Sequence, residues 1–108
     1  MKFNTKLLHG KAGRNASDGA TLPGISQVSA FSYDSAEHLE KVFGNKAPGF
    51  AYTRIGNPTV AAFEQRINEV EGGTGAVACA SGMAAITSAL LNILSAGDEI
   101  IAGSGLFG

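Results

Sequence analysis

The sequence has little cysteine, no long apolar run and no excess of positive charge. It contains a single cysteine, Cys79, which excludes an internal disulfide framework and a zinc site built on several thiolates. Lysine and arginine total 8 against 9 acidic residues, which leaves no basic surface for binding a nucleic-acid backbone. No stretch approaches the roughly 18–20 apolar residues of a membrane span, and the N-terminal apolar run is too short for a signal peptide. We therefore expect a cytoplasmic protein that binds neither nucleic acid nor membrane.

Glycine, in contrast, is abundant. The 108 residues include 15 glycines, about twice the average usage. They follow no fixed period, which excludes a collagen-like sequence. With 44% hydrophobic and 16% charged residues, the composition is that of an ordinary globular protein. The glycines indicate tight turns and close backbone approaches, as in α/β enzymes that hold phosphorylated ligands.

The first half of the chain is expected to contain few regular elements. Residues 1–30 have no sustained hydrophobic period and are interrupted by glycine and proline, which predicts an irregular arm. A short helix is expected over 35–43, with Ser35 as its N-cap. Residues 45–52 are expected to form a loop.

A longer helix is predicted after Asn57, which is a good N-cap residue. Pro58 stands in the first turn, where a missing N–H is tolerated, and an apolar stripe follows at steps of three and four residues. The pair Gly72-Gly73 ends the helix, because glycine can take the left-handed conformation.

An alternation of strands and a helix follows. We expect a buried strand over 75–80, a helix that Ser81 caps and Gly97 ends, and a second strand over 98–102. This order predicts an α/β fold with a parallel sheet. Cys79 lies inside the first of these strands and is expected to be a buried structural thiol. Because buried strands need neighbours on both sides, we also expect these residues to be part of a longer chain.

The junction between the first strand and the helix after it is a candidate anion site. The first N–H groups of a helix lack partners inside the helix and carry partial positive charge. Ser81 offers a hydroxyl, and Gly82 lets an anion come close to the backbone, so the junction can hold a phosphate without a basic side chain. From these residues alone, a capped helix with small residues for packing is an equally good interpretation.

A second candidate is the segment Tyr52-Thr53-Arg54, which precedes the longer helix. Tyr52 and Arg54 are two residues apart, so in an extended segment both side chains project to the same side. A guanidinium and a phenol together supply donors suited to a phosphate dianion. On residue types alone, an ordinary loop with an exposed arginine is the simpler interpretation.

Together the two segments resemble the Cys/Met metabolism enzymes that depend on pyridoxal 5'-phosphate (PLP). The resemblance covers nearly the whole chain and rests on Tyr-x-Arg-x-x-Asn-Pro-Thr, a helix ending in Glu-Gly-Gly, Ala-Ser-Gly-Met-Ala-Ala-Ile and Gly-Asp-Glu-Ile. It implies that the chain is the N-terminal portion of a fold-type I PLP-dependent transferase. Residues 1–57 would form an arm that contacts a neighbouring subunit, and residues 58–108 the start of the PLP-binding large domain.

The resemblance also implies roles for individual residues. Tyr52 and Arg54 would bind the PLP phosphate in the active site of a neighbouring subunit. The backbone at Ser81, Gly82 and Met83 would bind the phosphate in their own subunit. The cofactor-binding residues thus come from both candidate segments.

Other functional groups of the family are altered or missing here. Phe107 stands where the family usually has a tyrosine stacked on the pyridine ring, and a phenyl ring keeps the stacking area but lacks the hydroxyl. None of the five lysines matches the context of the lysine that carries PLP, so no catalytic residue is expected among these residues. His9 and His38 have no partner at metal-ligand spacing, so no metal site is expected.

The activity that the resemblance implies is γ-replacement on an activated homoserine ester. The intact helix junction and the ending Gly-Ser-Gly-Leu-Phe-Gly favour the O-acetylhomoserine sulfhydrylase branch. The alternatives are a cystathionine γ-synthase, a methionine or cystathionine γ-lyase and, in another class, a non-catalytic α/β oligomerisation module. The expected partners are a small amino-acid substrate and further copies of the chain, assembled as a dimer of dimers.

Overall fold

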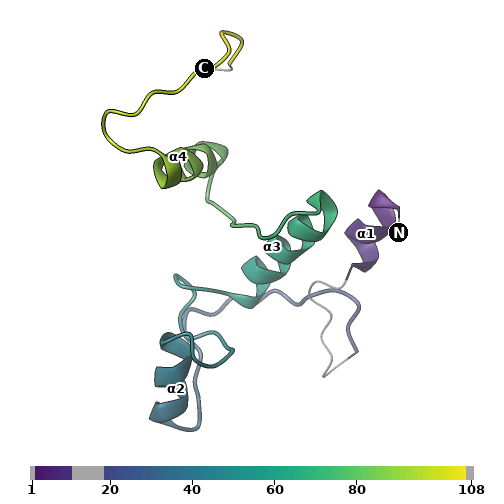
Figure 1. Cartoon of the computed structure of the whole chain (residues 1–108). Coiled ribbons are helices and arrows are strands. Elements are labelled where there is room, and N and C mark those ends of the chain that lie inside the picture. Colours follow the sequence, from purple (N-terminus) through teal and green to yellow (C-terminus); the bar gives the residue numbers. More distant parts are fainter. Residues whose placement is uncertain (1, 11–18, 107–108) are drawn as a thin grey trace. The chain divides into compact units, whose positions relative to one another are not determined.

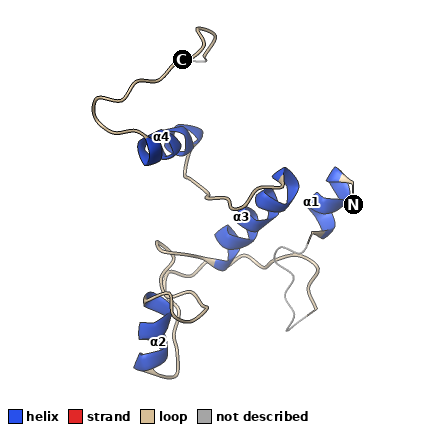
Figure 2. Ribbon diagram, in the orientation of Figure 1, coloured by secondary structure: helices blue, strands red, loops and turns tan. Residues whose placement is uncertain are grey.

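The computed structural model of the chain describes residues 2–10 and 19–106. The chain divides into two compact units, Met1–Ala78 and Cys79–Gly108. Within the described residues the regular elements are helices (Figures 1 and 2), with α1, α2 and α3 in the first unit and α4 in the second.

The first helix, α1 (Phe3–His9), lies where we expected an irregular arm, so that expectation is wrong for these residues. Lys2, at the N-cap position, makes no capping hydrogen bond through its side chain, and no local signal marks the start of the helix. The stabilising contact comes from α3, where Nη1 of Arg66 donates to the carbonyl oxygens of Lys6 (2.8 Å) and Leu7 (3.0 Å). A helix this short is marginal by itself, so α1 depends on a contact that periodicity cannot reveal.

The second helix, α2 (Ala36–Phe43), confirms the short helix predicted from the sequence. The hydroxyl of Ser35 accepts a hydrogen bond from the N–H of His38 at 3.1 Å. Before the helix, the hydroxyl of Tyr33 donates to the carbonyl oxygen of Phe50 (3.0 Å) and accepts from its N–H (3.1 Å). This one hydroxyl therefore ties the start of α2 to the loop that follows the helix.

The third helix, α3 (Pro58–Glu71), also begins and ends as predicted. The side-chain oxygen of Asn57 accepts a hydrogen bond from the N–H of Thr59 at 2.8 Å, and Pro58 occupies the first turn. Gly72 follows the last helical residue with a φ of 68°, the left-handed conformation that favours glycine.

A short antiparallel contact joins the chain before α2 to the chain before α3. Ala30 and Tyr52 form an isolated β-bridge. Beside it, the N–H of Thr53 donates to the carbonyl oxygen of Ser29 at 2.9 Å. The candidate segment at residues 52–54 is therefore held by a neighbouring stretch of backbone rather than standing free.

The two predicted strands, over 75–80 and 98–102, are not formed within the described part of the chain, which contains no strand. A strand exists only when a second segment lies beside it to share backbone hydrogen bonds. Val77 is 83% exposed and Ile101 is fully exposed, so neither run has found such a partner. An apolar run indicates a need for burial, but it does not say which segment provides the burial.

The fourth helix, α4 (Gly82–Ile93), begins as predicted and ends early. The hydroxyl of Ser81 accepts a hydrogen bond from the N–H of Ala84 at 3.1 Å. The helix stops before the glycine that we expected to end it, because a turn intervenes in which the Asp98 carboxylate accepts from the N–H of Ser95 at 2.7 Å. A short polar side chain of this kind competes with the helix for backbone groups.

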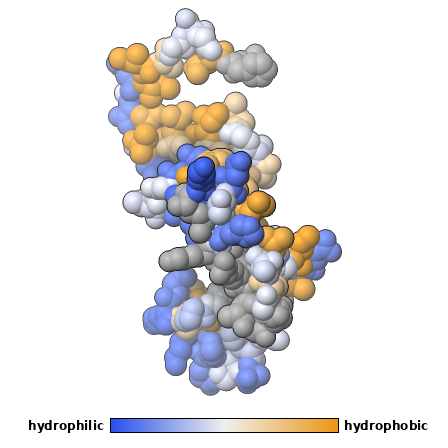
Figure 3. Space-filling view, turned by 90° about the vertical axis from the view of Figure 1, so that its right-hand side faces the viewer, coloured by the Kyte–Doolittle hydropathy of each residue, from blue (hydrophilic) through white to orange (hydrophobic). Residues whose placement is uncertain are grey.

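Few of the described side chains are buried. Val42 on α2 and Ala62 on α3 are the buried hydrophobic residues among those that the structure describes. Figure 3 shows apolar atoms gathered over α4 and the segment that follows it. Exposed apolar surface of this kind is typical of faces that other protein surfaces cover. On α4 the large exposed residues are Met83, Ile86, Leu90, Leu91 and Ile93.

The left-handed residue after α3 yields a stability prediction. Gly72→Ala should lower the free energy of unfolding of the folded protein by about 1–2 kcal/mol, because a Cβ is disfavoured in this conformation. Gly75→Ala is the matched control, since Gly75 has no positive φ and a Cβ there would meet no atom within 4 Å. Urea unfolding of both variants measures the difference, and equal stabilities would contradict the prediction.

Candidate functional site

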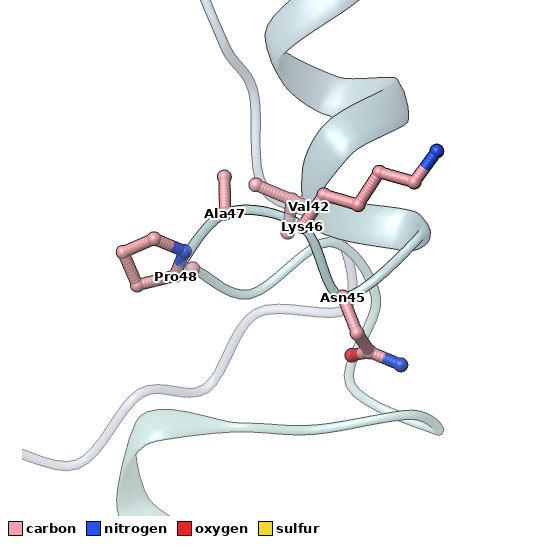
Figure 4. Close-up of a pocket in the computed structure, with 6 residues that line it drawn as sticks. Val42, Asn45, Lys46, Ala47 and Pro48 are labelled. Carbon is pink, nitrogen blue, oxygen red and sulfur yellow. The ribbon is translucent and has the colours of Figure 1, made fainter.

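The hollow after α2 does not bring functional groups together. It is lined by residues of α2 and of the loop that follows, among them Val42, Asn45 and Lys46. Figure 4 shows that the side chains of Asn45 and Lys46 point in different directions. Ligand sites need polar groups that converge on one point, so this hollow is a poor candidate.

The segment at Tyr52 and Arg54 has the better geometry. The carbonyl oxygen of Tyr52 accepts hydrogen bonds from the N–H groups of Ile55 (2.9 Å) and Gly56 (3.0 Å), which makes the segment a turn. We expected an extended segment, so the two side chains come together for another reason than the alternation of a strand. Cζ of Arg54 lies 5.2 Å from the centre of the Tyr52 ring. At this distance the guanidinium is attracted to the ring face.

Both side chains are available for a ligand. Tyr52 is 38% exposed and Arg54 is exposed as well. Within the described residues the Arg54 guanidinium makes no ion pair or hydrogen bond, and its contact is the Tyr52 ring. A guanidinium offers five N–H donors in a rigid plane. The pair therefore presents unused donors, with a positive charge, at the surface.

Arg54 also borders two hollows of the first unit. The first is mostly apolar and is lined by residues including Phe31, Phe43 and Ile55. The second includes the carboxylate of Glu64, whose Oε1 accepts a hydrogen bond from the N–H of Ala78 at 2.8 Å. Arg54 thus borders an apolar hollow and a second hollow that contains one carboxylate.

A buried asparagine, Asn57, holds the residue that stands between Tyr52 and Arg54. Asn57 is 4% exposed and is the buried polar residue of the described chain. Its Nδ2 donates to the carbonyl oxygen of Ser26 and to Oγ1 of Thr53, both at 3.1 Å. Sequence analysis identified Asn57 as a helix cap but missed these two bonds. The Thr that separates Tyr52 from Arg54 was the available signal, since its hydroxyl could bond to a nearby amide.

The start of α4 is the second candidate. The hydroxyl of Ser81 is used by the N–H of Ala84. The N–H groups of Gly82 and Met83 donate no hydrogen bond within the described residues, as is usual in the first turn of a helix. A Cβ placed on Gly82 would meet no atom within 4 Å, so packing within the described chain does not require glycine there.

The predicted residues fall in different parts of the chain. Tyr52 and Arg54 belong to the first unit, and Ser81, Gly82 and Met83 belong to the second. The structure brings the first two together and places the other three in one helix start. The sixth predicted position, at residue 107, lies outside the described residues.

The structure also bears on other expectations from the sequence. Cys79 is exposed, so the expectation of a buried thiol is wrong; the strand that would have buried it is not formed. His38 stacks on the ring of Tyr33 at 4.8 Å between centroids. Among the described residues no group of three histidine, cysteine or acidic side chains could hold a metal ion. Likewise, no described helix is long and apolar enough to cross a membrane.

Comparison with known proteins identifies the chain's relatives. A sequence profile of the family described as Cys/Met metabolism PLP-dependent enzyme matches residues 4–108. The chain is 43% identical over 106 residues to the O-acetyl-L-homoserine sulfhydrylase of Corynebacterium glutamicum, covering 98% of this chain and 24% of that protein. It is 40% identical over 106 residues to the L-methionine gamma-lyase of Porphyromonas gingivalis, covering 98% and 26%. The chain therefore spans about a quarter of the length of these curated relatives.

Solved structures agree with the sequence matches. An O-acetylhomoserine (thiol)-lyase from Campylobacter jejuni matches with a TM-score of 0.79 and 33% identity, over 91% of this chain and 24% of that one. That structure contains N'-pyridoxyl-lysine-5'-monophosphate. A cystathionine gamma-lyase from Lactobacillus plantarum matches with a TM-score of 0.73 and 38% identity, over 91% and 23%.

These matches confirm two expectations from the sequence. The chain has the fold of the N-terminal portion of a fold-type I PLP-dependent enzyme, the α/β class that was expected. The cofactor of the family is PLP. The chain belongs to the Cys/Met metabolism PLP-dependent enzymes.

Proposed function

We propose that the protein carrying this chain is a PLP-dependent O-acetylhomoserine sulfhydrylase. Such an enzyme replaces the acetate group of O-acetylhomoserine by sulfide. The observation that carries the proposal is the 43% identity to the Corynebacterium glutamicum sulfhydrylase over 98% of the chain. The match to the Campylobacter jejuni (thiol)-lyase structure supports the same branch.

A second candidate activity is methionine γ-lysis. It is favoured by the 40% identity to the Porphyromonas gingivalis L-methionine gamma-lyase, only slightly below the identity to the sulfhydrylase. Both reactions use a small amino-acid substrate and the same cofactor. A non-catalytic oligomerisation module, the alternative from another class, has less support because the relatives that match nearly the whole chain are named as enzymes.

The part that this chain plays in the enzyme is cofactor binding. When bound, PLP supplies a ring that withdraws electrons from the α-carbon of the substrate. Arg54 would bind the phosphate through charge-assisted hydrogen bonds, and the Tyr52 hydroxyl would add a further donor. Gly82 and Met83 would donate their free N–H groups to the phosphate, with the Ser81 hydroxyl beside them. The unused donors at both places support this assignment.

Further assignments extend the proposal beyond the described residues. Phe107 would stack on the pyridine ring, where its phenyl group offers apolar area without a hydroxyl. The lysine that holds PLP covalently would lie outside the 108 residues, since none of the five lysines stands in a matching sequence context. The protein would act in the cytoplasm as a homo-oligomer, a dimer of dimers, with residues 1–57 contacting a neighbouring subunit.

An activity assay separates the candidate functions. The full-length protein should form homocysteine from O-acetylhomoserine and sulfide, and should release acetate at the same rate. Methionine and cystathionine, tested at equal concentrations, should be poor substrates. Rapid release of ammonia and a thiol from methionine, with little homocysteine formed from O-acetylhomoserine, would favour the γ-lyase instead.

The start of α4 yields a prediction about cofactor affinity. In the full-length enzyme Gly82→Val should weaken PLP binding by tenfold or more, on the order of 1.4 kcal/mol, because a branched side chain would occupy the space of the phosphate. Stability should change little, since a Cβ at this position meets no atom within 4 Å. Ala85→Val, also in the first turn and exposed, is the matched control and should leave PLP affinity unchanged.

Equilibrium dialysis with PLP and thermal unfolding of the PLP-free protein measure the two effects of Gly82→Val separately. Comparable losses of stability and of PLP affinity would favour the interpretation that Gly82 serves helix packing.

The position of Arg54 yields a prediction about subunits. Arg54→Ala should cost on the order of 2–5 kcal/mol of PLP binding, the value expected for a lost charge-assisted contact. If Arg54 serves a neighbouring subunit, a mixed dimer of an Arg54→Ala subunit and a subunit lacking the distant lysine contains one intact site. Both defects then fall together in the other site.

Mixing the two inactive variants should therefore restore activity in proportion to the mixed dimers that form, as counted by native mass spectrometry. Mixed dimers without activity would mean that Arg54 serves its own subunit.

A further inference from the structure

We infer that Thr53 and Asn57 are positioning residues for phosphate binding, which act by fixing the turn that presents Tyr52 and Arg54. The inference rests on the proposed role of Arg54 at the PLP phosphate. It assigns to Thr53 and to the buried Asn57 of the Tyr-x-Arg-x-x-Asn motif a role of their own beside that of Tyr52 and Arg54.

Thr53 is held at three points. Its N–H donates to the carbonyl oxygen of Ser29 at 2.9 Å, and its hydroxyl donates to the carbonyl oxygen of Val28. The same hydroxyl oxygen accepts from Nδ2 of Asn57 at 3.1 Å. A residue fixed in this way leaves little freedom to the backbone of the residues on either side. Those two neighbours are the exposed pair of the candidate site.

Asn57 connects the turn to the helix that follows it. Both hydrogens of its Nδ2 are used, by Thr53 and by the carbonyl oxygen of Ser26, and its Oδ1 accepts from the N–H of Thr59. At 4% exposure, any bond that it loses leaves a polar group without water to replace the partner. A buried side chain whose polar groups are all paired favours one geometry over the alternatives.

A second contact attaches the segment of residues 24–29, which receives these bonds, to α3. The hydroxyl of Thr59 accepts from the N–H of Ser26 at 2.8 Å and donates to the carbonyl oxygen of Gly24 at 3.3 Å. The backbone that receives the Thr53 and Asn57 bonds is therefore itself anchored to the first turn of a helix. The turn at residues 52–56 is fixed against a rigid element rather than against a loose arm.

The exposed arginine needs this support from the backbone. Arg54 has a long flexible side chain, and within the described residues its contact is the Tyr52 ring. No hydrogen bond to residues 2–10 or 19–106 fixes its direction, so the direction from which it approaches a ligand is set by the backbone of the turn. Holding that backbone before the ligand arrives reduces the ordering that binding must impose.

The test compares two ligands that differ in the phosphate alone. Affinities for PLP and for pyridoxal, which lacks the phosphate, are measured on the PLP-free full-length protein by fluorescence titration. Thr53→Val removes both hydroxyl bonds but keeps the branched shape. It should lower the ratio of PLP affinity to pyridoxal affinity by about fivefold to tenfold, the effect of about one lost hydrogen bond.

Two further variants serve as rescue and control. Thr53→Ser keeps the hydroxyl and should restore most of the ratio. Ser35→Ala removes a capping bond of α2, which does not belong to this network, and should leave the ratio unchanged. If Thr53→Val does not fold, Thr53→Ala replaces it in the same comparison.

Combining Thr53→Val with Arg54→Ala shows whether Thr53 acts through Arg54. The double variant should have the ratio of Arg54→Ala alone, because a missing arginine cannot be misplaced. Equal weakening of PLP and pyridoxal by Thr53→Val, or full additivity with Arg54→Ala, would overturn the positioning role. A ratio that Arg54→Ala itself leaves unchanged would instead refute the proposed phosphate contact, so the two failures are distinguishable.

Discussion

The carboxamide of Asn57 is the interaction on which the candidate site of the first unit depends. Its oxygen caps α3, and its nitrogen donates hydrogen bonds to Ser26 and Thr53. One side chain therefore joins a helix, the turn at residues 52–56 and the segment of residues 24–29. Asn57 itself is only 4% exposed, which makes each of these bonds costly to lose. Tyr52 and Arg54 flank Thr53, so these bonds also hold the backbone of the exposed pair in place.

The two candidate segments would bind an anion by opposite means. At the turn the charge belongs to the flexible side chain of Arg54, so its position depends on the hydrogen bonds that hold the backbone of the turn. At the start of α4 the order is inherent in the helix, and the charge is the partial charge of its free N–H groups. Ser81 occupies one donor of the first turn and leaves those of Gly82 and Met83 unused.

Local rules predicted much of the chain, and non-local contacts account for the errors. The caps of α2, α3 and α4 and the glycine after α3 follow from the preferences of single residues, and all are present. The helix α1 was missed because its partner, Arg66, lies 60 positions from Lys6. The strands and the burial of Cys79 were predicted wrongly because an apolar run does not show which segment would pair with it or cover it. In the site, the family resemblance identified the arginine, but the bonds of Thr53 depend on backbone that the sequence could not place.

The bonds around Asn57 also suggest the order in which the polypeptide acquires structure. Four of them join residues 25 to 35 positions apart, and closing a loop of this size costs only slightly more entropy than closing a shorter one. A ribosome adds about 5–20 residues per second, so this loop can close while later residues are still being synthesised. The apolar side chains of α4 emerge afterwards and find no cover among the described residues of their own unit. In a growing polypeptide, the apolar face of α4 would then stay exposed until another protein surface covers it.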